Sequence, residues 1–251
     1  MGVDHDGTPL REFSHGRMMH RLPKADLVDR VAYLCEHAAG RRVIHVGFVD
    51  SGCRTMQEQA GAWLHGHLLP VASSLVGIDV DETGVQAATD AGYEAYAADC
   101  RDADALAALE LKPADLVIAG EIIEHLDDPG AFLAGLHTLV APGGELIVST
   151  PNAYGLFNVF ASLARREINH PDHVLMFTWR TLTNLAARHG WEPVATAVYV
   201  PTVKDLTGAD LSATVLGLCA GVAVGIERGM TRLGRSFAAD GMIVVFRSTR
   251  H

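Results

Sequence analysis

The alternation of apolar segments constrains this chain most. Between residues 41 and 150, five short β-rich apolar runs are separated by longer helical patterns, which is typical of parallel strands joined by crossover helices. The strands are expected to begin at Arg41, Ser74, Tyr93, Asp115 and Glu145, and the helices to cover Arg54–Leu69, Asp81–Ala91, Ala103–Leu109 and Pro129–Val140. The sequence therefore predicts an α/β fold on a mostly parallel sheet.

Two late strands, Glu192–Val200 and Gly241–Ser248, follow a predicted helix over Thr181–His189. They lack a crossover helix of the usual kind, so we expect an antiparallel hairpin at the sheet edge. An opening helix is expected over Lys24–Ala38. The length of 251 residues suits one α/β domain. We predict a flexible arm over residues 1–23 and a single domain over 24–251, with insertions near 152–178 and 201–238.

Composition excludes several classes of protein. A formal net charge of −10 with scattered Lys and Arg argues against a nucleic-acid partner. The four cysteines form no CxxC pair, which indicates reduced thiols and a cytoplasmic location, and the N-terminus lacks the apolar core of a secretory signal. The apolar stretch Leu211–Ile226 is shorter than the roughly 18 to 20 residues that span a bilayer. We expect no membrane span there, and a helix over 209–233 that is buried or joins copies into a homo-oligomer.

The ends of the predicted strands carry candidate ligand-binding residues, because open parallel sheets bind ligands at the carboxyl ends of their strands. Gly47 follows the first strand and allows close backbone approach, whereas Val49 replaces the second glycine of a dinucleotide fingerprint. Asp79 ends the second strand, where a carboxylate can accept hydrogen bonds from both hydroxyls of a ribose. Asp99 ends the third strand and could accept a hydrogen bond from an adenine amino group. Gly120 ends the fourth strand and leaves room for a flat ring or an amino-acid group.

The stretch "GEIIEHLDDPGAFLAG" follows the fourth strand and concentrates acidic residues and a histidine. A helix starting near Glu121 would place Glu121, Glu124 and His125 on one face. Three interpretations stay open: a Mg²⁺ or Mn²⁺ site, pocket residues without metal, or a helix start facing water. The later segment "NHPDHVLMFTW" adds His170 and His173, and a neutral imidazole there could take a proton from a hydroxyl. The other histidines singled out, His15, His20, His65, His67 and His189, are expected at the surface.

The segments "VIHVGFVDSG", "VGIDVD", "AADC", "DLVIAGEIIEHL" and "LVAPGGELIVSTPN" resemble class I S-adenosylmethionine-dependent methyltransferases over Arg41–Phe246. The general likeness is to small-molecule O-methyltransferases of the ubiquinone-biosynthesis type. It implies a Rossmann-like seven-stranded sheet whose last strand is antiparallel, and O-methylation of a sugar, a quinone-like compound or a natural product. The cofactor-binding residues that it implies are Gly47, Phe48, Asp50 and Ser51 for methionine, Asp79 and Val80 for ribose, Asp99 and Cys100 for adenine, and Gly120 and Glu121 beside them. The first loop has fewer glycines than is usual in the family, and His45 stands where an acidic residue is common.

The same resemblance places the acceptor pocket in the two insertions, so His173, His170 and His125 are the predicted catalytic residues. A local likeness to metal-dependent small-RNA 2′-O-methyltransferases implies that Glu121, Glu124, His125 and His173 hold Mg²⁺ or Mn²⁺. Metal-free relatives carry a similar E-x-x-E-H helix, and the sequence favours this metal-free interpretation. Two alternatives for the whole chain remain: a catalytically inactive cofactor-binding partner subunit, and an RNA 2′-O-methyltransferase.

Overall fold

A mixed sheet forms the centre of the protein. The computed structural model describes residues 21–50, 63–163, 165–167, 169–200, 222, 225–226, 228–231 and 233–250. Its strands are β1 (Asp26–Leu27), β2 (Arg42–Val46), β3 (Ser74–Asp79), β4 (Ala95–Ala97), β5 (Ala114–Gly120), β6 (Val140–Pro151), β7 (Trp191–Tyr199) and β8 (Gly241–Ser248), in the order β1-β7-β8-β6-β5-β2-β3-β4. β8 runs antiparallel to β6 and β7, and the other described pairs are parallel. The predicted α/β fold with an antiparallel last strand is confirmed.

The structure corrects two details of the predicted topology. The sheet has eight strands where seven were expected, because Asp26 and Leu27 pair in parallel with Ala197 and Val198 of β7. The two late strands form an antiparallel pair as predicted, but β8 lies inside the sheet between β7 and β6. The pairing shifts at Pro193, where a residue without an N–H cannot continue the ladder.

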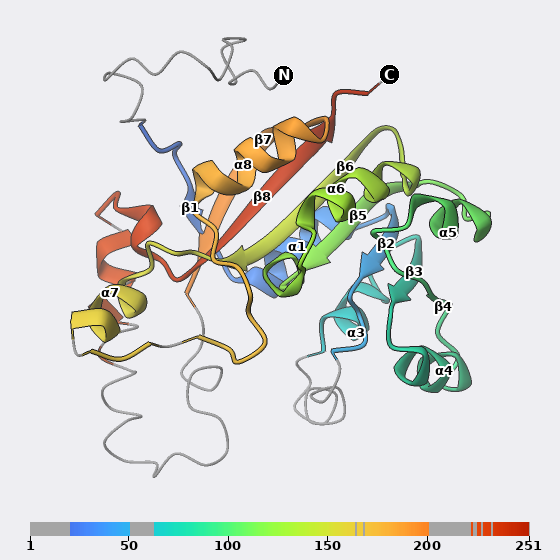
Figure 1. Cartoon of the computed structure of the whole chain (residues 1–251), viewed down its shortest axis with the longest axis horizontal. Helices are drawn as coiled ribbons and strands as arrows, with labels where there is room; N and C mark the ends of the chain where they lie inside the picture. The colour runs from blue at the N-terminus through green and yellow to red at the C-terminus, as the bar shows by residue number, and fades with distance from the viewer. Residues whose placement is uncertain are drawn as a thin grey trace.

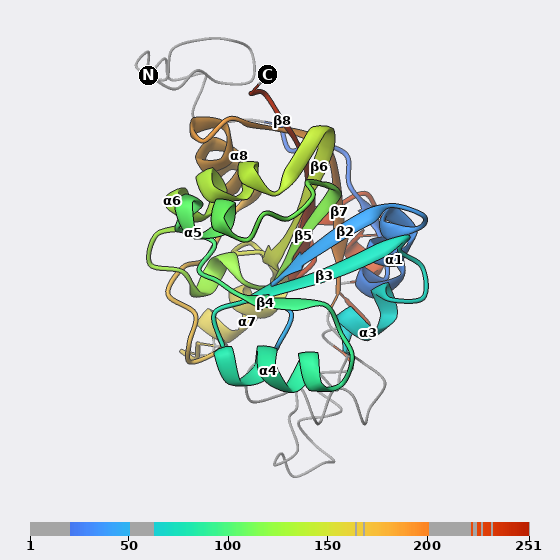
Figure 2. The same ribbon diagram turned by 90° about the vertical axis from the view of Figure 1, so that its right-hand side faces the viewer.

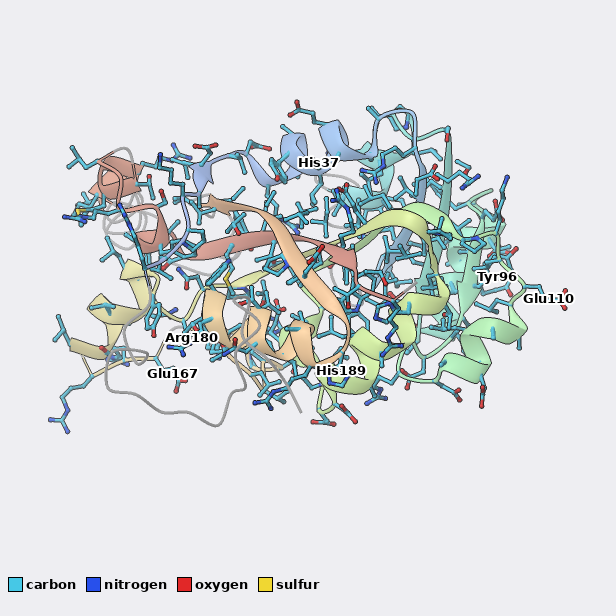
Figure 3. All side chains as sticks on the ribbon, turned by 90° about the horizontal axis from the view of Figure 1, so that it is seen from above. His37, Tyr96, Glu110, Glu167, Arg180 and His189 are labelled. Carbon is cyan, nitrogen blue, oxygen red and sulfur yellow. The ribbon has the colours of Figure 1, made fainter. Side chains whose placement is uncertain are left out.

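Helices cover both faces of the sheet (Figures 1 and 2). The described helices are α1 (Arg30–Ala38), α3 (Leu64–Leu68), α4 (Glu82–Asp90), α5 (Ala103–Ala108), α6 (Pro129–Gly135), α7 (Leu156–Leu163) and α8 (Trp179–Arg188). Figure 3 shows His37 of α1 on one side of the sheet, and Arg180 and His189 at the two ends of α8 on the other. Buried side chains of β5 alternate between the two cores: Leu116 and Ile118 pack with α1 and α3, whereas Val117 packs with α5, α6 and α8.

Aspartate side chains set where several helices begin. Asp29 accepts the N–H of Ala32 at 2.9 Å, and Asp128 accepts that of Ala131 at 2.9 Å, so α1 starts at Arg30 and α6 at Pro129. The opening helix is therefore shorter than predicted. The α6 helix is shorter too, because it tightens into a 3₁₀ turn over Leu136–Thr138 before β6 begins at Val140.

The strand order reverses at β2 and β5, which are neighbours in the sheet although β3 and β4 separate them in the chain. Val46 pairs with Ala119, so the loops that start at Gly47 and Glu121 leave the sheet side by side. Such a switch point is the usual ligand-binding position in an open α/β sheet. The chain leaves β6 at the same edge, and α7 lies beyond that end of the strand (Figure 1).

Some predictions fall on other parts of the chain. Ser51, residues 1–20 of the predicted arm, and residues 201–221 of the second insertion lie outside the described residues. Within the described part of the chain, no helix is long and apolar enough to cross a bilayer.

Candidate functional site

The loop after β2 is fastened to the tip of β3. Asp79 accepts the N–H of Val49 through Oδ2 at 2.9 Å and the N–H of Asp81 through Oδ1 at 3.1 Å. Gly47 has φ +72°, and a Cβ there would lie 2.6 Å from Cδ1 of Ile122. The close approach and the left-handed backbone therefore both require glycine. The neighbouring Val80 side chain is 66% exposed, which leaves an apolar surface next to the Asp79 carboxylate.

Phe48 is buried and fills the space beside β3. Its ring comes within 2.7 Å of where a Cβ of Gly77 would lie, and its carbonyl accepts the indole N–H of Trp63 at 2.8 Å. The side chain of Phe48 thus belongs to the core, and only its backbone borders the loop. Asp50, at the end of the described loop, is exposed and has φ +56°, a left-handed conformation that is uncommon for a residue other than glycine.

A guanidinium and a carboxylate lie together at the end of β5. Nη1 of Arg30 lies 3.2 Å from Ser149 Oγ, to which it donates, and 3.2 Å from where a Cβ of Gly120 would stand. The missing side chain at Gly120 thus gives room to Arg30. Glu121 has φ +53°, and its Oε1 accepts the hydroxyl hydrogen bond of Tyr199 at 2.7 Å. A strained, left-handed glutamate at a strand end is a feature that functional sites often carry.

Tyr199 joins these two charged groups. The guanidinium carbon of Arg30 lies 5.9 Å from the centroid of the Tyr199 ring, within reach of a cation–π contact. Burial, and then the nearby Glu121 carboxylate, raise the pKa of Tyr199 well above its ordinary value. The phenol therefore stays protonated and donates a hydrogen bond to Glu121.

Asp99 and Cys100 face different surroundings. Both oxygens of Asp99 bind Arg101, with Nε at 3.0 Å and Nη2 at 2.7 Å, and this hydrogen bonding lowers the pKa of the carboxyl. An adenine amino group would have to share Asp99 with Arg101. Cys100 is buried, and burial followed by the charges of Asp99 and Asp79 raises its pKa to about 12, so the thiol is not a nucleophile.

The predicted helix starting at Glu121 is wrong. Glu121 is left-handed, and a 3₁₀ turn covers Ile123–His125 in its place. The three polar side chains therefore do not share a face: Glu121 reaches Tyr199, Glu124 points into the core and His125 turns toward the later histidines. Asp128, at the end of the acidic stretch, caps α6.

Glu124 is fully buried. Its Oε2 accepts the hydroxyl hydrogen bond of Thr150 at 2.8 Å, and its carbonyl accepts the N–H groups of Val174 at 3.0 Å and Leu175 at 3.1 Å. Burial, and then the charge of Glu121, raise the pKa of Glu124 to about 8. The residue therefore ties the 3₁₀ turn to β6 and to the segment that carries the later histidines.

The three predicted catalytic histidines are brought together. His125 and His173 have ring centroids 4.6 Å apart, and His170 lies 5.8 Å from the first and 5.4 Å from the second. Potential ligand atoms of the three lie within 4.8 Å of one another. Burial, and then the neighbouring His125 and His170, lower the pKa of His173, so its ring is neutral at pH 7.

Two other histidines, His45 and His65, lie close to the loop that follows β2. The prediction that His65 lies at the surface is wrong: the residue is 1% exposed, and its Nδ1 lies 3.2 Å from Nδ1 of His45. The ring of Phe48 packs against His65 at 4.7 Å between centroids. Burial, then His65 and Arg30, lower the pKa of His45 well below its ordinary value. A neutral His45, next to the buried His65, therefore occupies the position where an acidic residue was expected.

Comparison with known proteins decides the family. Residues 24–196 match a family model described as "Methyltransferase domain". The chain belongs to the class I methyltransferase family. The ubiquinone biosynthesis O-methyltransferase of Burkholderia thailandensis is 32% identical to this methyltransferase over 116 residues, which are 46% of this chain and 47% of that protein. The chain thus spans about half the length of such relatives.

Solved structures of methyltransferases share the fold. A SAM-dependent methyltransferase from Archaeoglobus fulgidus superposes with a TM-score of 0.51 at 16% identity, covering 86% of this chain and 89% of that one. The small RNA methyltransferase HEN1 gives a TM-score of 0.52 at 17% identity, covering 93% of this chain but 27% of that one. At these identities the likeness concerns the fold alone.

The site of this methyltransferase has the groups that S-adenosylmethionine requires. Arg30 and Glu121 offer opposite charges to the carboxylate and ammonium of an amino acid. Asp79 keeps further lone pairs for ribose hydroxyls beyond its two backbone contacts. The donor set therefore fits the cofactor.

Sequence reasoning missed Arg30 and Tyr199. Both lie far along the chain from Gly120, in segments whose patterns predicted only a helix and a strand. The one available signal was that an arginine, Arg30, stands in the predicted opening helix, just before the strand that Gly47 follows. Only the packing of α1 against the sheet brings this guanidinium to the site.

Proposed function

We propose that this protein transfers a methyl group from S-adenosylmethionine to an oxygen atom of a small molecule. The cofactor, when bound, supplies an electrophilic methyl group on a sulfonium sulfur. The amino-acid end of the cofactor would contact Arg30 through its carboxylate and Glu121 through its ammonium group. Asp79 would accept the ribose hydroxyls, and the exposed Val80 would cover one side of the adjoining ring system.

The histidine cluster supports an oxygen acceptor. His125 lies four residues after Glu121, so the cluster adjoins the turn that carries the proposed cofactor contact. The neutral ring of His173 would take the proton of the acceptor hydroxyl, while the cofactor would supply the methyl group to that oxygen and keep the electrons of the carbon–sulfur bond. Holding the oxygen in line with the methyl group supplies a large part of such a rate enhancement.

Neighbouring side chains favour an acceptor with an apolar ring. Val174 is 55% exposed and Met176 is 36% exposed, and both follow His173 directly along the segment. The net charge of −10 favours a neutral or cationic molecule over RNA. The relatives named ubiquinone biosynthesis O-methyltransferase support a quinone-like hydroxyl. The observation that carries the proposal is that the turn after β5 begins with Glu121, which shares Tyr199 with Arg30, and ends with His125 of the histidine cluster.

The test measures binding and turnover separately. Calorimetry with S-adenosylhomocysteine should show saturable binding, and mass spectrometry should show an O-methylated product with at least one member of a panel of catechols, phenols and sugars. A short RNA with free 2′-hydroxyls serves as the competing acceptor.

Each other outcome has a definite meaning. Failure to bind S-adenosylhomocysteine refutes the proposal at its first step. Binding without turnover on any acceptor supports an inactive cofactor-binding partner subunit. Methylation of the RNA alone supports an RNA 2′-O-methyltransferase, and an N-methylated product refutes the oxygen acceptor. A cytoplasmic location and a homo-oligomer through residues 209–233 stay predictions.

A further inference from the structure

We infer that His125, His170 and His173 form a binding site for a borderline divalent cation of the zinc class. The site lies on the acceptor side of the turn, and its role in holding the acceptor oxygen rests on the proposed function. Its ligands come from two separate segments: His125 from the 3₁₀ turn after β5, and the other two from the segment after α7.

The distances between the histidines are close to those of a metal site. Their potential ligand atoms lie within 4.8 Å of one another. Nitrogens bound tetrahedrally to zinc at ordinary bond lengths are about 3.4 Å apart, so the ligand atoms must approach one another by up to about 1.4 Å. His170 is exposed and can turn without disturbing the core.

Hydrogen bonds already fix two of the rings in a metal-binding tautomer. Nδ1 of His125 lies 3.2 Å from the carbonyl oxygen of Asp172, and Nδ1 of His173 lies 2.6 Å from Oδ1 of Asn169. Both partners are oxygen acceptors, so each Nδ1 carries a proton and donates it. Each Nε2 then keeps its lone pair, which is the outer-shell arrangement that metal-bound histidines use.

A buried oxygen of Glu124 faces the same space. Glu124 is fully buried, and its Oε1 has no hydrogen-bond partner among the described residues. This atom lies 4.0 Å from Nε2 of His173. An unsatisfied buried oxygen is costly, and a cation bound at His173 would give this oxygen an attractive partner.

The ligand types select the cation. Imidazoles suit Zn²⁺ and similar transition metals, whereas Mg²⁺ prefers oxygen ligands. The Mg²⁺ or Mn²⁺ site that the family resemblance implied included Glu121 as a ligand. Tyr199, however, already donates a hydrogen bond to Oε1 of that carboxylate. Three imidazoles with one carboxylate nearby therefore favour the zinc class.

The test uses metal binding as its readout, independent of turnover. The full-length protein, stripped with a chelator, is titrated with Co²⁺, and its visible absorption is recorded before displacement with Zn²⁺ or Mg²⁺. We expect a tetrahedral Co²⁺ spectrum that Zn²⁺ abolishes and that an equal concentration of Mg²⁺ leaves in place. The double variant His125→Gln/His173→Gln should lose this spectrum, and Asn169→Ala should weaken Co²⁺ binding by about 10- to 100-fold.

The chain has 13 histidines in all, so a matched control separates this site from the remaining ones. His67→Gln alters an exposed histidine on α3 and should bind Co²⁺ like the wild type. The inference is overturned if the wild type gives no tetrahedral spectrum, if the double variant keeps it, or if Mg²⁺ displaces Co²⁺ equally well. S-adenosylhomocysteine binding is measured on the same samples, so a failure of the proposed function shows itself separately.

Discussion

Replacing Arg30 with methionine tests how the cofactor is held. The change keeps an apolar stem of similar length and removes the guanidinium that contacts Ser149 and lies above Gly120. A hydrogen bond to a charged group contributes about 1.5 to 3 kcal/mol. Loss of that contact should weaken binding of S-adenosylhomocysteine by about 10- to 150-fold, since 1.4 kcal/mol corresponds to a factor of ten.

Two ligands make the assay specific for the carboxylate contact. S-adenosylhomocysteine carries the amino-acid group, whereas 5′-methylthioadenosine has the same nucleoside without it. Calorimetry on the Arg30→Met variant should show the full loss with the first ligand and little change with the second. Arg42→Met is the matched control, because Arg42 pairs with Asp115 at 2.8 Å at the opposite end of β2.

Three results would refute this reasoning. An equal loss for both ligands would mean that Arg30 shapes the pocket without binding the carboxylate. Unchanged binding of S-adenosylhomocysteine would place the carboxylate elsewhere. A comparable loss in Arg42→Met would point to the net charge of the protein. Thermal unfolding of each variant checks that the sheet remains folded.

Three further changes probe the ribose contact, the core and a buried carboxyl. Asp79→Ala should weaken S-adenosylhomocysteine binding by about 1.5 to 3 kcal/mol in calorimetry, and unchanged affinity would remove the ribose assignment. Trp191→Ala should lower the free energy of unfolding in urea by about 3 to 5 kcal/mol, because the indole is fully buried and donates to the Leu133 carbonyl at 2.8 Å; a loss below about 1 kcal/mol would contradict its place in the core. Burial raises the pKa of Asp240 from 3.8 to about 6, so its folded state favours the protonated carboxyl. The free energy of unfolding should therefore fall as pH rises through that window, and urea titrations of Asp240→Asn should lack this part of the slope; an identical slope would refute it.

The sheet could be predicted because its strands are nearly continuous apolar runs. Residues buried on both faces, such as those of β5, have few alternatives to a central parallel strand. The edge strand β1 could not be predicted, because two residues carry no periodic pattern and pair only where β7 is already in place. The early end of α6 likewise depends on where β6 begins its pairing, which is a tertiary contact.

Strand ends gave the positions of Asp79 and Gly120, but not the partners of these residues. Periodicity does not show which distant side chain fills the space over a glycine, so the contact with Arg30 came only from the fold. The burial of His65 was missed for a similar reason. Its helix is short, and the imidazole is buried because His45 and an aromatic ring of Phe48 surround it.

The motif E-x-x-E-H shows why helical spacing did not predict how its three polar side chains are arranged. Helical spacing would gather the two glutamates and the histidine on one face, but the left-handed backbone of Glu121 interrupts that helix at its first residue. Glu121 consequently turns toward Tyr199 and the proposed cofactor side, whereas Glu124 and His125 turn toward the histidines of the later segment. A helix would have presented all three groups to one ligand. The strained turn divides them between two, so that Glu121, the proposed contact of the methyl donor, lies within four residues of His125, the proposed contact of the acceptor.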